Sequence, residues 1–427
     1  MISSLTDIII IKQNTIRMKI GLLAYHSAIN FGATLQLLST YMYLIKKGHN
    51  PIIINWIPDD LADFYKEITP QAQIESQEQL RKSIWKETEL CKSSQDVADV
   101  LIREHIEAVI IGSDAVAQHH PLLERIVFPC RTIIGINKNT TDNEYPNPFW
   151  ATWLSLLPKR IPVALLSASC QDSAYKLIPP KIRKEMNKRI YDYSYISVRD
   201  EWTKDMISYI TKQDIIPPIT PDPVFAFNQN AGELIASKED ILKKYDLPEN
   251  YFVLSFLNKG KRTSVDQKWI NEFETIVKAN NAICVSLPFS HKEGFGNITK
   301  KISLPLSPLD WYGIIKYSKG YIGNNMHPIV VCLHNNIPFY SFDNYGRGHF
   351  NGLITSDSSS KIKHIITKAH LSKNRTSCMS YFFKAPAPLQ VFSAIKSFDY
   401  AACDEFRKEY SSSYNEMLDN IFKSFGL

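Results

Sequence analysis

Short apolar runs alternate with longer amphipathic stretches along most of this chain. Met18–Tyr25 and Pro51–Trp56 are apolar runs of strand length, and Gly32–Lys47 between them has apolar residues at a period close to 3.6. Gly48 follows at the position typical of a helix C-cap. A strand, a helix and a second strand in this order predict a βαβ unit, and therefore a parallel sheet.

Three further apolar runs continue this alternation. Glu107–Asp114, Pro162–Ser169 and Tyr195–Arg199 each predict a strand. Residues 59–99 are polar, charged and weakly periodic, which indicates a helical insertion. The segment Asp142–Trp153 is rich in Asn, Pro and aromatic residues, so we expect a surface loop near a site, with rings suited to stacking on a sugar.

Four prolines within residues 215–227 indicate a crossover into a second domain with its own strand and helix alternation. We predict an α/β protein with two Rossmann-like domains that face each other across a cleft, where the carboxyl ends of the strands bind ligands. The predicted parts are a first domain at 18–220, a second at 221–385, and helices at 386–427 that pack back across the first domain. Residues 1–17 precede Met18 and are expected to lie outside the fold.

Length and composition fit this organisation. A chain of 427 residues with 44% hydrophobic and 22% charged residues is typical of a globular protein with two domains. No apolar run approaches the roughly 18 residues that a membrane span needs. The net charge of +6 suits acidic small molecules or an anionic membrane face, and is weak evidence for nucleic acid.

Cysteine and histidine spacing argues against a metal site. The seven cysteines are scattered without a CxxC pair, which favours reduced thiols in a cytoplasmic protein. His119 and His120 are adjacent, without nearby cysteines or paired carboxylates, and are a weak metal signal. We therefore expect neither a disulfide framework nor a metal.

Polar residues gather where predicted strands end. Gly32 permits close backbone approach, and Asn30 is either a ligand or a helix cap. Arg199 either binds an anionic ligand or pairs with Asp200 or Asp222. The second such loop consists of residues 112–114, which include Ser113 and Asp114.

The segment 319–338, KGYIGNNMHPIVVCLHNNIP, is the most informative one. It reads as a strand, a polar loop and a helix, with His327 at the point where strand gives way to helix. Helix N-termini present free backbone N–H groups to anions, so His327 is a candidate acid or base beside an anionic substrate. With Arg199 and Arg347 it would form a cationic pocket.

These loops, in this order, resemble the polysaccharide pyruvyl transferase family. The matching pieces are MKIGLLAYHSAINFGATLQ (18–36), VIIGSD (109–114), ISVRDEWT (196–203), PDPVF (221–225) and SPLDWYGIIKYSKGYIGNNMH (307–327). The resemblance implies a glycosyltransferase-B-like fold. It also implies transfer of pyruvate from phosphoenolpyruvate to two hydroxyls of a sugar as a ketal, with release of phosphate.

The resemblance also assigns roles and partners. It implies phosphoenolpyruvate as co-substrate without a further cofactor, and a surface-polysaccharide sugar as acceptor. That sugar would be lipid-linked and galactose-like, ketalated at the 4 and 6 hydroxyls, at the inner face of the membrane. Its implied residues are His327 as general acid, Arg199 in catalysis and donor binding, Arg347 and Asn325 in donor binding, and Asn30, Gly32, Ser113 and Asp114 on the acceptor side.

Two departures keep other functions open. Asn325-Met326 stand where many members have an Arg-Leu or Ser-Phe type pair before the histidine, so a donor-binding arginine is missing there and Lys319 or Arg262 would have to supply that charge. Ala115 replaces a usual glutamine after Gly-Ser-Asp, which leaves the acceptor contacts open. A nucleotide-sugar glycosyltransferase of the same architecture and an inactive carbohydrate-binding homologue remain alternatives.

Overall fold

The first domain is built on a five-stranded parallel sheet. The computed structural model describes residues 18–427 except 131–132, 258–264 and 350–353, so residues 1–17 and Arg262 lie outside the described part. The sheet has the order β2-β1-β3-β6-β7, and every neighbouring pair in it is parallel. Its strands are β1 (Lys19–Leu23), β2 (Asn50–Ile53), β3 (Ala108–Asp114), β6 (Val163–Ala168) and β7 (Tyr195–Val198).

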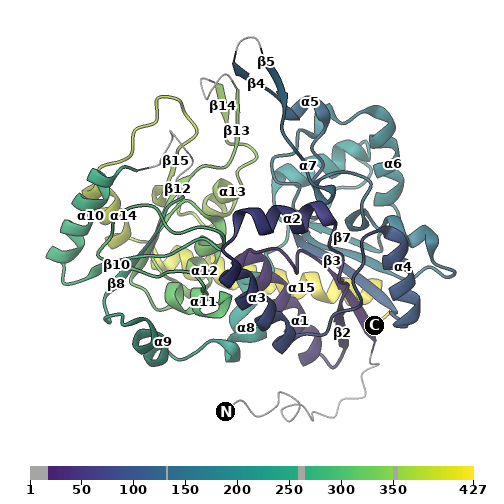
Figure 1. Cartoon of the computed structure of the whole chain (residues 1–427), viewed down its shortest axis with the longest axis horizontal. Coiled ribbons are helices and arrows are strands. Elements are labelled where there is room, and N and C mark those ends of the chain that lie inside the picture. The colour runs from purple at the N-terminus through teal and green to yellow at the C-terminus, as the bar shows by residue number, and fades with distance from the viewer. Residues whose placement is uncertain (1–17, 131–132, 258–264, 350–353) are drawn as a thin grey trace.

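The second domain repeats this architecture with six parallel strands in the order β10-β9-β8-β11-β12-β15. Two parallel-sheet α/β domains confirm the predicted fold class (Figure 1). The strands are β8 (Tyr251–Ser255), β9 (Ile283–Ser286), β10 (Lys300–Lys301), β11 (Gly320–Gly323), β12 (Phe339–Asp343) and β15 (Arg375–Ser377).

Helices cover both faces of the two sheets, and the central strands are buried throughout. All seven residues of β3 and all five of β8 are buried, as expected for parallel strands that lie between helical layers. The covering helices include α4 (Ser94–Arg103), α6 (Pro180–Ile190), α7 (Glu201–Ile210), α9 (Lys238–Tyr245), α10 (Gln267–Ala279) and α13 (Lys361–Lys368).

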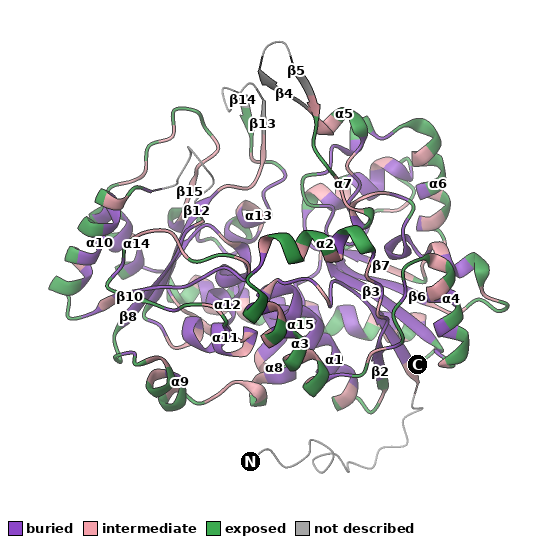
Figure 2. Ribbon diagram, in the orientation of Figure 1, coloured by how far each residue is buried: buried purple, intermediate pink, exposed green. Residues whose placement is uncertain are grey.

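A layer of helices joins the two domains. It consists of α1 (Phe31–Lys46), α8 (Phe227–Ala231), α11 (Pro308–Lys316), α12 (Met326–Asn335) and α15 (Tyr400–Ser424). One hydrophobic cluster runs from the first sheet through these helices to the second sheet, and Figure 2 shows buried residues in both sheets and on the helices between them. Apolar burial on this scale stabilises one arrangement of the two domains relative to each other. The carboxyl ends of their strands therefore keep a fixed position across the contact between the domains.

The segment 386–427 contains two helices that pack in different places. α14 (Pro388–Lys396) packs against α10 and belongs to the core of the second domain. α15 returns across the helix layer to β7, and its Met417 sulfur lies 3.3 Å from the hydroxyl of Ser167 in the neighbouring strand β6. Among the described residues, no helix is both long and apolar enough to cross a bilayer.

The insertion after β2 is helical and reaches the second domain. It contains α2 (Asp59–Ile68) and α3 (Gln71–Ile84), and the Gln73 amide exchanges hydrogen bonds of 2.7 and 3.0 Å with the Leu306 backbone. α2 lies between the two sheets (Figure 1). The remaining elements are α5 (Leu122–Arg125) and the hairpins β4 (Ile126–Cys130) with β5 (Ile133–Ile136) and β13 (Arg347–His349) with β14 (Ile354–Ser356).

The expectation for Asp142–Trp153 was wrong in one respect. Its rings do not form a stacking platform, because Phe149, Trp150 and Trp153 are all at most 3% exposed and pack in the core of the first domain. The Trp153 indole donates to the Pro148 carbonyl at 3.1 Å. These aromatic side chains stabilise a loop and are not available to a sugar.

Candidate active site

His327 lies at the contact between the two domains. It is the second residue of α12, which begins where β11 ends, and only 5% of it is exposed. Burial lowers the pKa of His327, while the carboxylates of Asp222 and Asp114 act in the opposite direction. The lowered pKa favours the neutral imidazole, and its Nε2 has no hydrogen-bond partner among the described residues.

The first domain approaches this ring through Gly32. A Cβ atom added at Gly32 would lie 2.1 Å from His327 Cγ and Nδ1, far inside van der Waals contact. Asn30 caps the same helix, α1, by accepting from the Gly32 and Ala33 amides at 3.0 and 3.3 Å. The missing side chain of Gly32 thus leaves room for the imidazole. Asn30 is a helix cap, which is one of the two alternatives that the sequence left open.

A cavity of about 270 Å³ opens on His327, and we name it the His327 cavity. Asn325 is the N-cap residue of α12, but its side chain accepts no hydrogen bond from the backbone amides of the first turn. An uncapped helix N-terminus in a cavity is a favourable place for an anion. The lining includes Asn30, Gly32, Phe64 and Tyr65 from the first domain and Ser255, His291, Trp311, Asn325 and His327 from the second.

Arg199 follows β7 and is only 4% exposed, with two carboxylates as partners. Its terminal nitrogens contact Asp222 at 2.8 Å and Asp114 at 3.2 Å, and Asp222 also accepts from the Gln36 amide at 2.6 Å. Asp200 is not a partner; its carboxylate caps α7 by accepting from the Thr203 amide at 2.8 Å. An anionic ligand of Arg199 would have to share it with these carboxylates.

Lys361 is a second buried cation at this place, and sequence reasoning missed it. It opens α13, is 8% exposed, and its ammonium lies 4.9 Å from the centre of the Tyr345 ring. Burial and the charge of Arg199 lower the pKa of Lys361. Among the described residues it forms no ion pair. Its signal in the sequence is faint: a lysine directly after three serines.

The other predicted cations lie further out. Arg347, in β13, has its guanidinium 5.9 Å from the centre of the Trp202 ring and 4.0 Å from a Glu124 oxygen, so it reaches across to the first domain. Lys319 is exposed and precedes β11, at the end of the strand opposite to His327. It therefore does not supply the charge that Asn325 lacks.

A larger cavity of about 650 Å³ lies under α2, and we name it the α2 cavity. Its size is typical of small-molecule sites. It shares Asn30, Phe64 and Tyr65 with the His327 cavity, so the two are neighbours. Carboxylates, amides and rings make up most of its lining: Asp60, Asp63, Glu67, Asp114, Asp142, Gln118, Asn139, Asn143, Gln171, Tyr25, Phe64 and Tyr65.

Phe64 and Asp63 come from the insertion that the sequence left without a role. The Phe64 ring is 45% exposed on α2 and lines both cavities. An exposed ring above a polar cavity is the kind of surface on which a sugar stacks. The sequence signal that could have found it is the cluster of acidic and aromatic residues at 59–67.

Tyr25, Gln118 and Asp142 form a hydrogen-bonded group in the α2 cavity. The Tyr25 hydroxyl donates to Asp142 Oδ2 at 2.9 Å and accepts from the Gln118 amide at 2.9 Å. Asp142 is 3% exposed, and its second oxygen, Oδ1, has no partner among the described residues. The same holds for the hydroxyl of Ser113, in β3.

The two buried carboxyl groups of this cavity differ in acidity. Burial raises the pKa of Asp142, and the hydrogen bond from Tyr25 offsets this only in part. Burial acts the same way on Asp114, but the charges of Arg199 and Lys361 outweigh it and lower the pKa of Asp114. Because the pKa of Asp142 is raised, this group is suited to proton transfer. The pKa of Asp114 is lowered, so this group is suited to remain charged.

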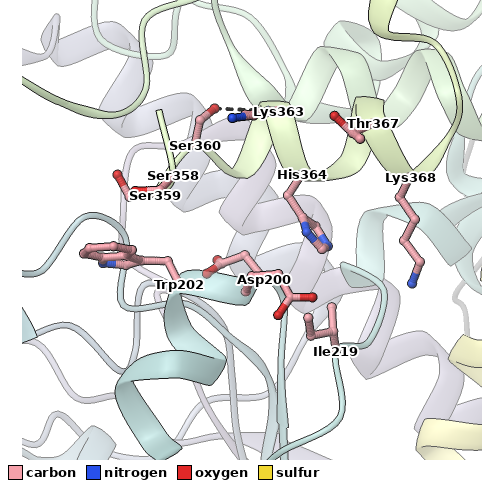
Figure 3. Close-up of a pocket in the computed structure, with 11 residues that line it drawn as sticks. Asp200, Trp202, Ile219, Ser358, Ser359, Ser360, Lys363, His364, Thr367 and Lys368 are labelled. Atoms are coloured by element: carbon pink, nitrogen blue, oxygen red, sulfur yellow. Dashed lines mark hydrogen bonds between the residues drawn. The ribbon is translucent and has the colours of Figure 1, made fainter. Parts of the chain in front are cut away.

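A third cavity, of about 440 Å³, lies between α7 and α13 (Figure 3). Its charged groups are already engaged: Asp200 caps α7, Lys363 pairs with Asp357 at 2.7 Å, and Lys368 lies over the Tyr410 ring. In Figure 3, Asp200 and Trp202 face His364 and the serines that precede α13. This arrangement favours a structural contact between the domains.

The chain belongs to the polysaccharide pyruvyl transferase family. The description of that family, "Polysaccharide pyruvyl transferase", matches residues 30–345, which is most of the chain. The matched region contains Arg199, His327 and most of the lining of both cavities; it begins after Tyr25 and Ala28 and ends before Arg347 and Lys361. The family confirms the resemblance found in the sequence and identifies the protein as a transferase of polysaccharide biosynthesis.

Solved structures similar to this chain share its fold. UDP-N-acetylglucosamine 2-epimerase from Rickettsia bellii is 12% identical with a TM-score of 0.51, covering 95% of this chain and 96% of its own. The epimerase from Neisseria meningitidis bound to UDP-GlcNAc is 10% identical with a TM-score of 0.51, covering 95% and 100%. UGT89C1 of Arabidopsis thaliana complexed with UDP is 8% identical with a TM-score of 0.50, covering 96% and 100%.

These similarities confirm the glycosyltransferase-B architecture. At such low identity they concern the fold alone. A comparison with the curated proteins gave no significant match.

Proposed function

We propose that this transferase moves the pyruvyl group of phosphoenolpyruvate onto two hydroxyls of one sugar, forming a ketal and releasing phosphate. The acceptor would be a hexose such as galactose, ketalated at the 4 and 6 hydroxyls, in a lipid-linked precursor of a surface polysaccharide. The observation that supports this most is the position of His327, at an uncapped helix N-terminus in a small cavity that shares Asn30, Phe64 and Tyr65 with a larger polar one.

The donor would bind in the His327 cavity. Phosphoenolpyruvate carries a phosphate and a carboxylate on a three-carbon frame, and the α12 N-terminus offers amides and a favourable dipole to such an anion. Asn325 lines this cavity, and Lys361 and Arg199 add positive potential beside it. Arg347 would approach the donor from β13 as a further anion contact.

His327 would act as the general acid. An anion beside a buried imidazole favours the protonated form, so donor binding would raise a pKa that burial has lowered. The imidazolium then gives its proton to C3 of the donor while a sugar hydroxyl adds to C2. Phosphate leaves, and the second hydroxyl closes the ketal. In the overall reaction, the two hydroxyl groups lose two protons. One of them ends in the new methyl group, and the other ends on the released hydrogen phosphate.

Phosphate release tests this proposal. Wild-type protein should release phosphate from phosphoenolpyruvate when a galactoside is present and not without one. His327→Gln should lower the rate by about 10²–10⁴-fold, the range for loss of a general acid. The exposed His370, changed to Gln, is the matched control and should leave the rate unchanged.

Two outcomes would overturn the proposal. One is consumption of a nucleotide sugar, with no phosphate released from phosphoenolpyruvate, which would indicate a glycosyltransferase. The other is sugar binding without any turnover of the donor, which would indicate an inactive binding protein.

A further inference from the structure

The α2 cavity is strongly acidic. Among its described lining residues are five carboxylates, against one lysine, Lys138, and one histidine, His120. That histidine already faces Glu124, with 3.4 Å between its Nδ1 and the carboxylate. A cavity with this balance repels anions and suits neutral or cationic ligands.

These carboxylates are not all committed to the fold. Asp60 accepts from the Thr141 amide and hydroxyl at 2.7 and 2.9 Å, and Asp114 pairs with Arg199. In contrast, Asp63 and Glu67 are exposed on α2 above the cavity. Within the part of the chain that the structure describes, neither carboxylate forms an ion pair or a hydrogen bond that would explain its place there.

Asp142 is the strongest indication of a ligand. A structural role accounts for one of its oxygens, which accepts from Tyr25. The loop around it is closed by Asn147, whose amide donates to the Asp142 and Glu144 carbonyls at 2.9 Å. The other carboxyl oxygen is buried without a partner in the described structure, although Asp142 lines the cavity. A buried acceptor with nothing to accept calls for a donor from outside.

We propose that the α2 cavity binds the acceptor as a sugar ring without negative charge, and that Asp142 binds the hydroxyl that attacks the donor. This rests on the proposed function. The sugar hydroxyl gives its proton to Asp142 Oδ1 while the hydroxyl oxygen forms a bond to C2 of the donor. At the same time, C3 of the donor takes a proton from His327. The bond from C2 to the phosphate oxygen then breaks, and the phosphate leaves with the bonding electrons.

The acidic lining predicts which sugars the α2 cavity binds. Neutral hexoses and amino sugars would be accepted, and uronic acids or sugars that already bear a ketal carboxylate would be rejected. The product gains a carboxylate, so it would be repelled from the same cavity. Charge repulsion would therefore assist product release and prevent a second ketal on the same residue.

A charge series of acceptors tests this class by isothermal titration calorimetry with the full chain. The probes are methyl β-galactopyranoside, its uronate and its 2-amino derivative, each without donor. The uronate should bind at least about tenfold more weakly than the neutral glycoside. The double variant Asp63→Asn/Glu67→Gln should bring the two within about threefold, whereas Glu75→Gln/Asp99→Asn, an equal change of charge outside the cavity, should not.

Asp142→Asn tests the proton acceptor. The amide keeps an oxygen for the Tyr25 hydroxyl, so the fold should persist, and the control Asp99→Asn changes an exposed acid on α4. We expect kcat to fall by about 10²-fold or more while KM for the glycoside changes less than about threefold. Retention of wild-type kcat would overturn the role of Asp142.

The outcomes separate the two proposals. Phosphate release that is faster with the uronate than with the neutral glycoside would overturn the charge class and leave the pyruvyl transfer intact. If the neutral glycoside binds more tightly than the uronate, but no acceptor leads to phosphate release from phosphoenolpyruvate, the pyruvyl transfer is overturned. The preference for acceptors without negative charge is then supported.

Discussion

The two sides of the cleft differ in charge and in the way they are built. On the His327 side, two helix N-termini and two histidines line a small cavity, and the charge of the buried Lys361 acts on His327 from outside that lining. On the α2 side, carboxylates and amides surround a cavity more than twice as large. If the chain transfers pyruvate as proposed, it must hold an anionic donor and a polyhydroxyl acceptor in separate places until they react. The difference in charge would sort the two substrates between the cavities, which meet at Asn30, Phe64 and Tyr65.

Arg199 should affect stability more than any other residue of the cleft. Arg199→Met leaves Asp114 and Asp222 as buried charges without their partner, so the free energy of unfolding should fall by about 3–5 kcal/mol. Urea denaturation measures this. Arg160→Met, which removes an exposed pair with Asp192, should cost less than about 1 kcal/mol. Weaker donor binding with unchanged stability would instead make Arg199 a free donor ligand.

Gly32→Ala should damage catalysis without unfolding the protein. The added methyl group would occupy the place of the His327 ring and displace it, and such misplacement costs about 10²-fold in rate. Gly232→Ala is the matched control, because its Cβ would meet its nearest neighbour at an ordinary 3.8 Å. Full activity of Gly32→Ala would mean that the imidazole position does not matter.

Proton uptake should accompany donor binding and not acceptor binding. Burial lowers the pKa of His327, and an adjacent anion raises it, so the imidazole gains a proton when the donor binds. Between the two pKa values the donor affinity should therefore rise as pH falls, by up to about tenfold per pH unit. Calorimetry in buffers of different ionisation enthalpy measures the uptake.

His327→Gln is the control for this linkage, because phosphoenolpyruvate also titrates near neutral pH. The variant should lose the part of the uptake that belongs to the imidazole. Equal uptake in wild type and variant would show that His327 does not become charged. Proton uptake on binding a neutral glycoside would contradict the division between the two sides.

Phe64→Ala should have the smallest effect, and on the acceptor alone. The ring is exposed over the α2 cavity, and stacking of this kind contributes about 0.5–1.5 kcal/mol, so KM for the glycoside should rise several-fold. Steady-state kinetics with each substrate varied in turn measures this. A similar rise in KM for phosphoenolpyruvate would place the donor in contact with α2.

The architecture could be predicted from the sequence for a physical reason. Strands of a parallel sheet are buried on both faces, so Glu107–Asp114 and Tyr251–Phe256 stand out as continuous apolar runs. Helix ends were equally legible: Ser307 caps α11 and Asn30 caps α1, as their residue types suggest. Local chemistry determines these features.

The contacts of the site could not be read in the same way. Pairing of Arg199 with Asp222 was one open alternative, whereas pairing with Asp114 depends on the order of strands in the sheet. Lys361 has little beside it in the sequence to mark it. The rings at Phe149–Trp153 were placed wrongly because aromatic composition does not distinguish a core from a sugar platform, and Phe64 was passed over for the same reason.

A crystal structure of the slow variant His327→Gln with phosphoenolpyruvate and methyl β-galactopyranoside would test the central claim most directly. The account predicts the donor phosphate or carboxylate at the N-terminus of α12 and the sugar ring under α2, with a hydroxyl within hydrogen-bond distance of Asp142 Oδ1. Donor density in the cavity between α7 and α13, or both ligands on one side of residue 327, would contradict it.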